Sequence, residues 1–150
     1  MADTLVRPVR LPLGGMAHSL YGALLPVPIV CFIGALASDL VYTGNPAMMW
    51  IDFSSWLLLA GLIGGGFALL VLMIDMFRLG HHRPAMMVTH FVLLVTAWVV
   101  EVFNSLIHAR DGWTAVVPTG IMLSITAVVL SLVAGWFWQS ARYAAAGDIR

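Results

Sequence analysis

Four long apolar stretches run along this sequence, and polar or turn-forming positions separate them. The stretches cover about residues 20–41, 55–77, 86–107 and 116–138. Because a membrane-spanning helix needs about 20 mostly apolar residues, each stretch is long enough to cross a bilayer. Glycine and proline occur in the first two breaks, at 43–46 and 79–84, and an Asp–Gly pair occurs in the third, at 110–112. The pattern therefore predicts four transmembrane helices.

The connections between these stretches are short, so consecutive helices should pack antiparallel. The sequence thus predicts an all-α integral membrane protein built as an up-down four-helix bundle. No soluble domain, solenoid repeat or low-complexity tract is evident, and we expect residues 1–150 to form a single four-helix transmembrane domain. The first stretch is longer than the about 7–15 apolar residues of a cleavable signal peptide, which indicates that it is retained as a span.

Composition supports lipid as the solvent of this chain. Of its 150 residues, 61% are hydrophobic and 9% charged, with a mean hydropathy of +0.98, whereas a soluble domain carries about a quarter charged residues. The formal net charge is zero, which argues against nucleic acid as a partner. Cys31 is the single cysteine, and one cysteine excludes an internal disulfide or a cysteine-built metal cluster.

The arginines predict the orientation, because positively charged loops tend to stay in the cytoplasm. Arg110 falls on one side of the expected bundle, and the other six basic residues fall on the side that holds both termini and the second loop: Arg7, Arg10, Arg78, Arg83, Arg142 and Arg150. The sequence therefore predicts cytoplasmic termini. Aromatic residues at the span ends, among them Tyr21, Tyr42, Trp56 and Trp138, are interpreted as interface anchors.

The third stretch carries a polar stripe. Glu101, Asn104 and His108 follow His90 by 11, 14 and 18 positions, close to three, four and five turns of a helix. These residues should share one face with Ala97 and point into the bundle. Ionisable groups in a membrane span mark functional sites, and we expect Glu101 to be protonated or paired. The alternative is that the stripe joins the helices by hydrogen bonds.

Two aspartates are placed to meet this stripe. Asp75 and His90 lie at nearly the same depth on either side of the second loop, which predicts a hydrogen bond between them. Asp39 lies one turn before the outer end of the first stretch. It should face Glu101, Asn104 or His108 if it points inward, and otherwise it reaches the outer headgroup region.

Haem b is a candidate cofactor, because haem iron in membrane helices is held by histidines that project into a shared pocket. His18 and His90 lie on the same side and form the candidate axial pair, with Asp75 nearby. They differ in depth by roughly six residues, about 9 Å along parallel helices, so pairing requires the segment before the first span to fold inward. Otherwise both histidines anchor at the interface. Pro26 and Pro28 should kink the first span, either around a ligand pocket or as a plain bend.

A set of spaced residues runs through all four stretches: His18, Pro26, Pro28, Ile29, Asp39 and Leu40, then Trp56, Ala60, Gly61, Leu62 and Asp75, then His90 and Asn104, then Gly135 and Trp136. This set resembles an uncharacterised bacterial family of predicted four-helix membrane proteins, known as a domain of unknown function. The resemblance covers nearly the whole chain. It departs from the family pattern at Ser19, where a proline is usual, and at Phe137 and Trp138, where small residues are usual.

The resemblance implies a bacterial inner-membrane protein in a redox setting, because genes of this family are often found near periplasmic dehydrogenases and electron carriers. The function it implies is a small membrane subunit of a redox or respiratory-type complex. That subunit would anchor a partner dehydrogenase and bind haem b or quinone for electron transfer. The expected partners are the lipid bilayer and other membrane or periplasmic redox subunits, and a homo-oligomer is an open alternative.

Two other functions stay open at this point. One is a cofactor-free structural or assembly subunit, and the other is a small ion or proton transporter that works as an oligomer through Asp39, Asp75 and Glu101. The sequence contains no nucleophile–base pair, phosphate loop or metal-ligand spacing, so we do not expect catalytic activity of its own.

Overall fold

The protein is described by a computed structural model over residues 15–82, 85–110 and 116–147, with side chains over 20–81, 85–110 and 116–140. All elements within these ranges are helical. The long helices are α1 (Gly15–Leu24), α2 (Pro26–Gly44), α3 (Met48–Leu79), α4 (Ala85–His108) and α5 (Ile121–Gly147), and the short ones are η1 (Gly80–His82) and η2 (Val116–Gly120). The predicted all-α class is confirmed.

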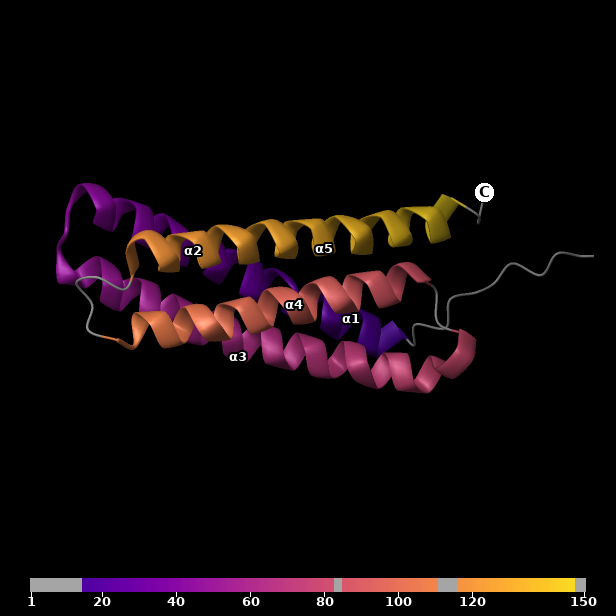
Figure 1. Cartoon of the computed structure of the whole chain (residues 1–150). Helices are drawn as coiled ribbons and strands as arrows, with labels where there is room; N and C mark the ends of the chain where they lie inside the picture. The colour runs from indigo at the N-terminus through magenta and orange to yellow at the C-terminus, as the bar shows by residue number, and fades with distance from the viewer. Residues whose placement is uncertain (1–14, 83–84, 111–115, 148–150) are drawn as a thin grey trace, which may run out of the picture.

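Four segments of the described chain are long and apolar enough to cross a membrane: Leu20–Gly44, Met48–Leu79, Ala85–His108 and Val116–Ser140. They alternate in direction, so the fold is an up-down bundle (Figure 1). The start of α1, η1 and the end of α5 lie at one end, which we call the η1 end. The α2–α3 turn and η2 lie at the other, the η2 end. The single-domain assignment stays a prediction.

The second span begins earlier than its apolar stretch suggests. We predicted residues 55–77, but α3 starts at Met48, directly after the extended residue Ala47. Asp52 and Ser54 interrupt the apolar run, which is why the sequence placed the start too late. Ser54 is fully buried and Asp52 is exposed, so the first turns of α3 already present one face to the bundle.

The first span is broken at Leu25 into α1 and α2. Pro26 and Pro28 have no N–H, so the carbonyls of Gly22 and Leu24 lose their helical partners. The chain stays close to helical there, since Leu25 has α-helical angles and its N–H donates to the Tyr21 carbonyl at 2.9 Å. The break therefore joins two helical pieces that follow each other along the bundle (Figure 1).

Close packing of α2 on α3 depends on glycine. A Cβ atom at Gly61 would lie 2.5 Å from Cε1 of Phe32, whose ring is almost completely buried. Small residues let helix backbones approach in lipid, where dispersion forces rather than water exclusion drive association. The glycines of α3 thus serve packing within this bundle.

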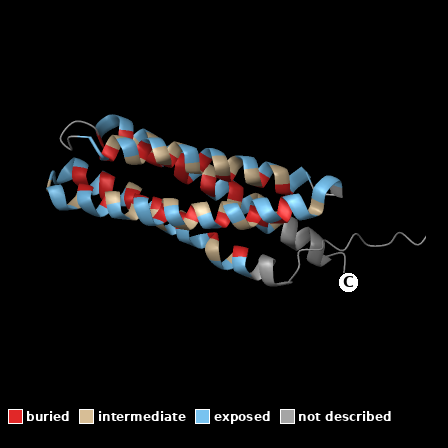
Figure 2. Ribbon diagram, turned by 90° about the horizontal axis from the view of Figure 1, so that it is seen from below, coloured by how far each residue is buried: buried red, intermediate tan, exposed pale blue. Residues whose placement is uncertain are grey.

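Buried residues face the space between the helices, and exposed ones cover the outside (Figure 2). The outside is apolar: Trp56, Phe77 and Trp136 are each at least 70% exposed. Such a surface is stable only against hydrocarbon, so the helices contact the lipid bilayer. Tyr21, Tyr42 and Trp138 are instead buried, which corrects their interpretation as interface anchors.

Candidate functional site

The polar face of α4 points into the bundle, as its spacing predicts. His90, Ala97, Glu101 and Asn104 are at most 1% exposed, and His108 is 7% exposed. Each is surrounded by protein although several are ionisable. Because such groups are costly to place at membrane depth, what they bond to decides what they do.

Six buried polar side chains gather toward the η2 end, and we call them the η2-end cluster: Asp39, Ser54, Glu101, Asn104, His108 and Ser124. They come from α2, α3, α4 and α5, so every span contributes. If any span rotated about its axis by one residue position, its polar side chain would no longer reach the cluster. The cluster therefore fixes the rotation of all four helices about their axes.

Asp39 and His108 form the charged centre of this cluster. His108 Nε2 lies 3.0 Å from Asp39 Oδ1, and Ser54 Oγ lies 3.3 Å from the same nitrogen. His108 Nδ1 lies 3.0 Å from the Asn104 carbonyl oxygen, which can only accept, so Nδ1 carries a hydrogen. The bond to Asp39 then requires one further proton, held by the ring or by the carboxyl group. The pair is a proton-sharing pair.

Ser124 and Asn104 connect this pair to Glu101. The Ser124 hydroxyl donates to Asp39 Oδ2 at 3.1 Å. The amide of Asn104 donates one hydrogen to Ser124 Oγ at 2.8 Å and the other to Glu101 Oε2 at 2.9 Å. An amide has two N–H hydrogens, and these two bonds use both of them. The direction of each hydrogen bond from Glu101 through Asn104 and Ser124 to Asp39 is therefore fixed.

Two acceptor atoms of the cluster stay open. Glu101 Oε1 and Asn104 Oδ1 are buried, and neither has a hydrogen-bond partner among the described residues. Asn104 Oδ1 lies beside Gly120, where a Cβ atom would be 3.5 Å away, and His108 Cε1 would be 3.3 Å from that Cβ. Buried polar atoms without partners are uncommon in folded proteins and call for an explanation.

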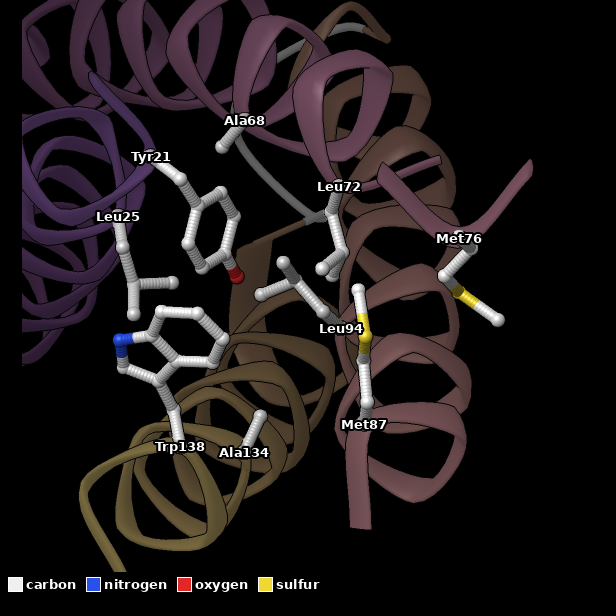
Figure 3. Close-up of a cluster of buried hydrophobic side chains, with 9 residues drawn as sticks. All are labelled: Tyr21, Leu25, Ala68, Leu72, Met76, Met87, Leu94, Ala134 and Trp138. Atoms are coloured by element: carbon white, nitrogen blue, oxygen red, sulfur yellow. The ribbon is translucent and has the colours of Figure 1, made fainter. Parts of the chain in front are cut away.

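A second polar contact lies toward the η1 end. Tyr21 is hydrogen-bonded to His90 Nε2, and His90 Nδ1 lies 2.7 Å from the Ala134 carbonyl oxygen. Since that carbonyl only accepts, Nδ1 donates and Nε2 accepts from the tyrosine hydroxyl. Trp138 packs edge-on against the Tyr21 ring, with 4.7 Å between ring centroids. Figure 3 shows Tyr21 and Trp138 within an apolar cluster that includes Leu72 and Leu94.

The other predicted site residues are placed as follows. His18 belongs to α1, but its side chain lies outside the described residues, so the His18–His90 pair stays a prediction. Asp75 is buried, yet both ring nitrogens of His90 take other partners and no hydrogen bond joins it to Asp75. No group of three His, Cys, Asp or Glu side chains in the described part of the chain is placed to hold a metal ion.

Comparison with known proteins places this architecture in a family. Residues 17–146 match the model of a family described as predicted membrane protein (DUF2231). The chain belongs to this family. No curated protein and no solved structure matches it. The resemblance seen in the sequence is thus confirmed over nearly the whole chain.

Sequence reasoning missed three residues of the candidate site in this DUF2231 protein. Ser54 falls just outside the predicted second span, Ser124 carries no charge that marks it as a polar contact, and Tyr21 was interpreted as an interface aromatic. The available signal for Ser124 was its helical spacing from Gly120 and Ala127, which places its hydroxyl on the buried face of α5. Nothing local distinguishes Tyr21 from a lipid-facing tyrosine.

Proposed function

We propose that this chain is a small membrane subunit of a bacterial redox complex. In this proposal it lies in the inner membrane with both termini in the cytoplasm, anchors a partner dehydrogenase, and exchanges protons with a quinol at the η2-end cluster. The observation that carries the proposal is the Asp39–His108 pair, an ionisable couple completely enclosed by four membrane helices. Such groups at membrane depth serve proton or ligand chemistry by default.

The cluster has the parts that proton exchange needs. The Asp39–His108 pair shares one proton, and the hydroxyls of Ser54 and Ser124 stabilise either form by hydrogen bonds. The oxygens Glu101 Oε1 and Asn104 Oδ1 have no partner among the described residues and are free to accept hydrogen bonds from a ligand that carries hydroxyl groups. Reduction of a bound quinone to quinol would take two electrons from the partner dehydrogenase and two protons, and the Asp39–His108 pair would hold one proton beside the quinone.

Haem fits His90 less well than the sequence suggested. Iron binds a ring nitrogen through its lone pair, but Nε2 of His90 accepts from Tyr21 and Nδ1 donates to Ala134. Ligation by His90 would require the loss of one of these bonds. The redox proposal therefore depends on quinone and not on haem, and an absorbance spectrum of the reduced protein in the Soret region tests the haem prediction.

The proposal is tested by isolating the tagged protein in native lipid discs and measuring extracted quinone against total lipid. We expect quinone enrichment in the wild type and its loss in Asp39→Asn. Asp52→Asn is the matched control, because Asp52 is a carboxyl of the same half of the bundle that is exposed. Wild-type discs with no more quinone than discs of bulk membrane, and with no dehydrogenase in them, would overturn the proposal.

A cofactor-free structural subunit is the second candidate function. The observation in its favour is that the η2-end cluster joins all four spans, as interhelical hydrogen bonds do in bundles without ligands. Under this alternative a co-purified partner enzyme keeps full activity when Asp39 or Glu101 is neutralised. Under the redox proposal the electron transfer from that partner to quinone falls at least tenfold.

A further inference from the structure

Glu101 lies where the polar η2-end cluster meets apolar packing. Counted from the Asn104–Ser124 contact at 1.5 Å per residue, Glu101 lies about 4.5 Å toward the η1 end. Val128, which belongs to a buried apolar cluster, lies about 6 Å toward that end on the same count. The Glu101 side chain is fully buried, so no solvent at the bundle surface reaches its carboxyl group. These surroundings favour the neutral form of the carboxyl.

No net positive charge compensates Glu101 within the part of the chain that the structure describes. The ionisable groups that act on it are His108 and Asp39. Their pair holds one proton besides the hydrogen on His108 Nδ1, so its net charge is zero whether the ring or the carboxyl carries that proton. The cluster residues from α3 and α5, Ser54 and Ser124, do not ionise. An ionised Glu101 would therefore give the buried cluster a net negative charge, which is costly in an apolar interior.

The hydrogen bonds of Glu101 leave one place for a proton. Oε2 accepts an N–H of Asn104 at 2.9 Å, whereas Oε1 has no partner among the described residues. In a protonated carboxyl group one oxygen carries the hydrogen and the other accepts. Because the Asn104 nitrogen only donates, the proton belongs on Oε1. Protonation thus changes Oε1 from an open acceptor into a donor.

Asn104 keeps this proton apart from the one shared by Asp39 and His108. It donates one N–H to Glu101 and the other to Ser124, and an amide nitrogen acts only as a donor. A proton therefore does not pass through this amide from Glu101 to Ser124. The neutral cluster holds two separate acidic protons, one on Glu101 and one on the pair, and reduction of a quinone to quinol takes two.

We propose that Glu101 is a neutral carboxyl that gives the second proton to the quinone of the redox proposal, on which this inference rests. The O–H bond at Oε1 breaks, an O–H bond forms on a quinone oxygen, and Glu101 is left as a carboxylate. With the proton of the Asp39–His108 pair and two electrons from the partner dehydrogenase, the product is a neutral quinol. Oε1 is then able to accept a hydrogen bond from a quinol hydroxyl.

The charge of Glu101 is measurable without any ligand, because Glu101 is the only glutamate in the sequence. Protein made with carbon-labelled glutamate therefore gives a single glutamate carboxyl signal, and solid-state NMR separates a protonated acid from a carboxylate. We expect the protonated form at neutral pH in lipid bilayers. Asp52→Glu adds a second, exposed glutamate as an internal reference, and its signal should be that of a carboxylate. A carboxylate signal from Glu101 would overturn the proposal.

Proton transfer is tested with Glu101→Gln, which keeps an oxygen for the Asn104 bond but releases no proton. In native lipid discs with the co-purified dehydrogenase, we expect this variant to hold as much quinone as the wild type. Electron transfer to that quinone should be at least about tenfold slower. Glu101→Asp should recover part of the rate, and the exposed control Asp52→Asn should keep all of it. Wild-type rates in Glu101→Gln, or loss of its quinone, contradict the role of Glu101 as a proton donor.

Failure of this inference is distinguishable from failure of the redox proposal. Wild-type discs without enriched quinone and without a dehydrogenase overturn both. Discs that hold quinone, but in which Glu101 gives a carboxylate signal, overturn the role of Glu101 alone.

Discussion

Asp39 on α2 and His108 on α4 meet at 3.0 Å although 69 positions separate them in the chain. Ser124 binds the second oxygen of the carboxyl, and the Asn104 carbonyl binds the second nitrogen of the ring. Both oxygens of the Asp39 carboxyl and both nitrogens of the His108 ring thus have a hydrogen-bond partner. The pair joins the first span to the third and the fourth.

This pairing predicts strong energetic coupling. Breaking a buried ion pair by removing one partner costs about 3–5 kcal/mol, so Asp39→Asn and His108→Gln should each lower the unfolding free energy by about 3 kcal/mol. The double variant should lose less than the sum by about 1–3 kcal/mol. The measurement is a double-mutant cycle of unfolding in mixed detergent micelles, with Asp52→Asn as an unaffected control. Additive losses would show that the contact contributes nothing.

The Tyr21–His90 hydrogen bond predicts that removing the Tyr21 hydroxyl alone lowers the stability of the protein. Tyr21→Phe leaves Nε2 of His90 buried without a donor, which costs about 1–3 kcal/mol. Tyr42→Phe should change stability much less, because Tyr42 is similarly buried and makes no hydrogen bond within the described residues. Nitrogen NMR of labelled histidine should show a shifted His90 Nε2 signal in Tyr21→Phe only. An unchanged signal would contradict the described contact.

The contact of Gly61 with Phe32 predicts a clash in a variant that adds one carbon. Gly61→Ala places a Cβ atom 2.5 Å from the Phe32 ring, which is 2% exposed, and overpacking of this kind costs about 1–3 kcal/mol. Gly66→Ala on the same helix is the control, since its nearest contact would be 3.9 Å away. Helix propensity favours alanine at both positions. A Gly61→Ala protein as stable as Gly66→Ala would refute the close approach.

The proposed orientation predicts which turn faces the periplasm. In a Cys31→Ala background, Thr43→Cys at the η2 end should react with a membrane-impermeant maleimide added to whole cells. His81→Cys at the η1 end should react only after the cells are opened. Both positions are exposed, so access to reagent decides the result. The reverse pattern would place the termini in the periplasm.

The sequence by itself determined the four spans and the inward face of α4. Apolar length gives the spans, because a bilayer of fixed thickness demands it. The positions of His90, Glu101, Asn104 and His108 follow from the 3.6-residue period, which is local geometry. The start of α3 was predicted too late, because Asp52 and Ser54 interrupt the apolar run that marks a span.

Only the tertiary structure decided which polar groups meet. The sequence left Asp39 with three candidate partners, and the rotation of four packed helices selected His108 and Ser124. It also moved Tyr21 from an expected interface position to a buried one that holds His90. The physical reason is that lipid and protein interior are both apolar, so hydrophobicity along a span does not distinguish the inward from the outward face.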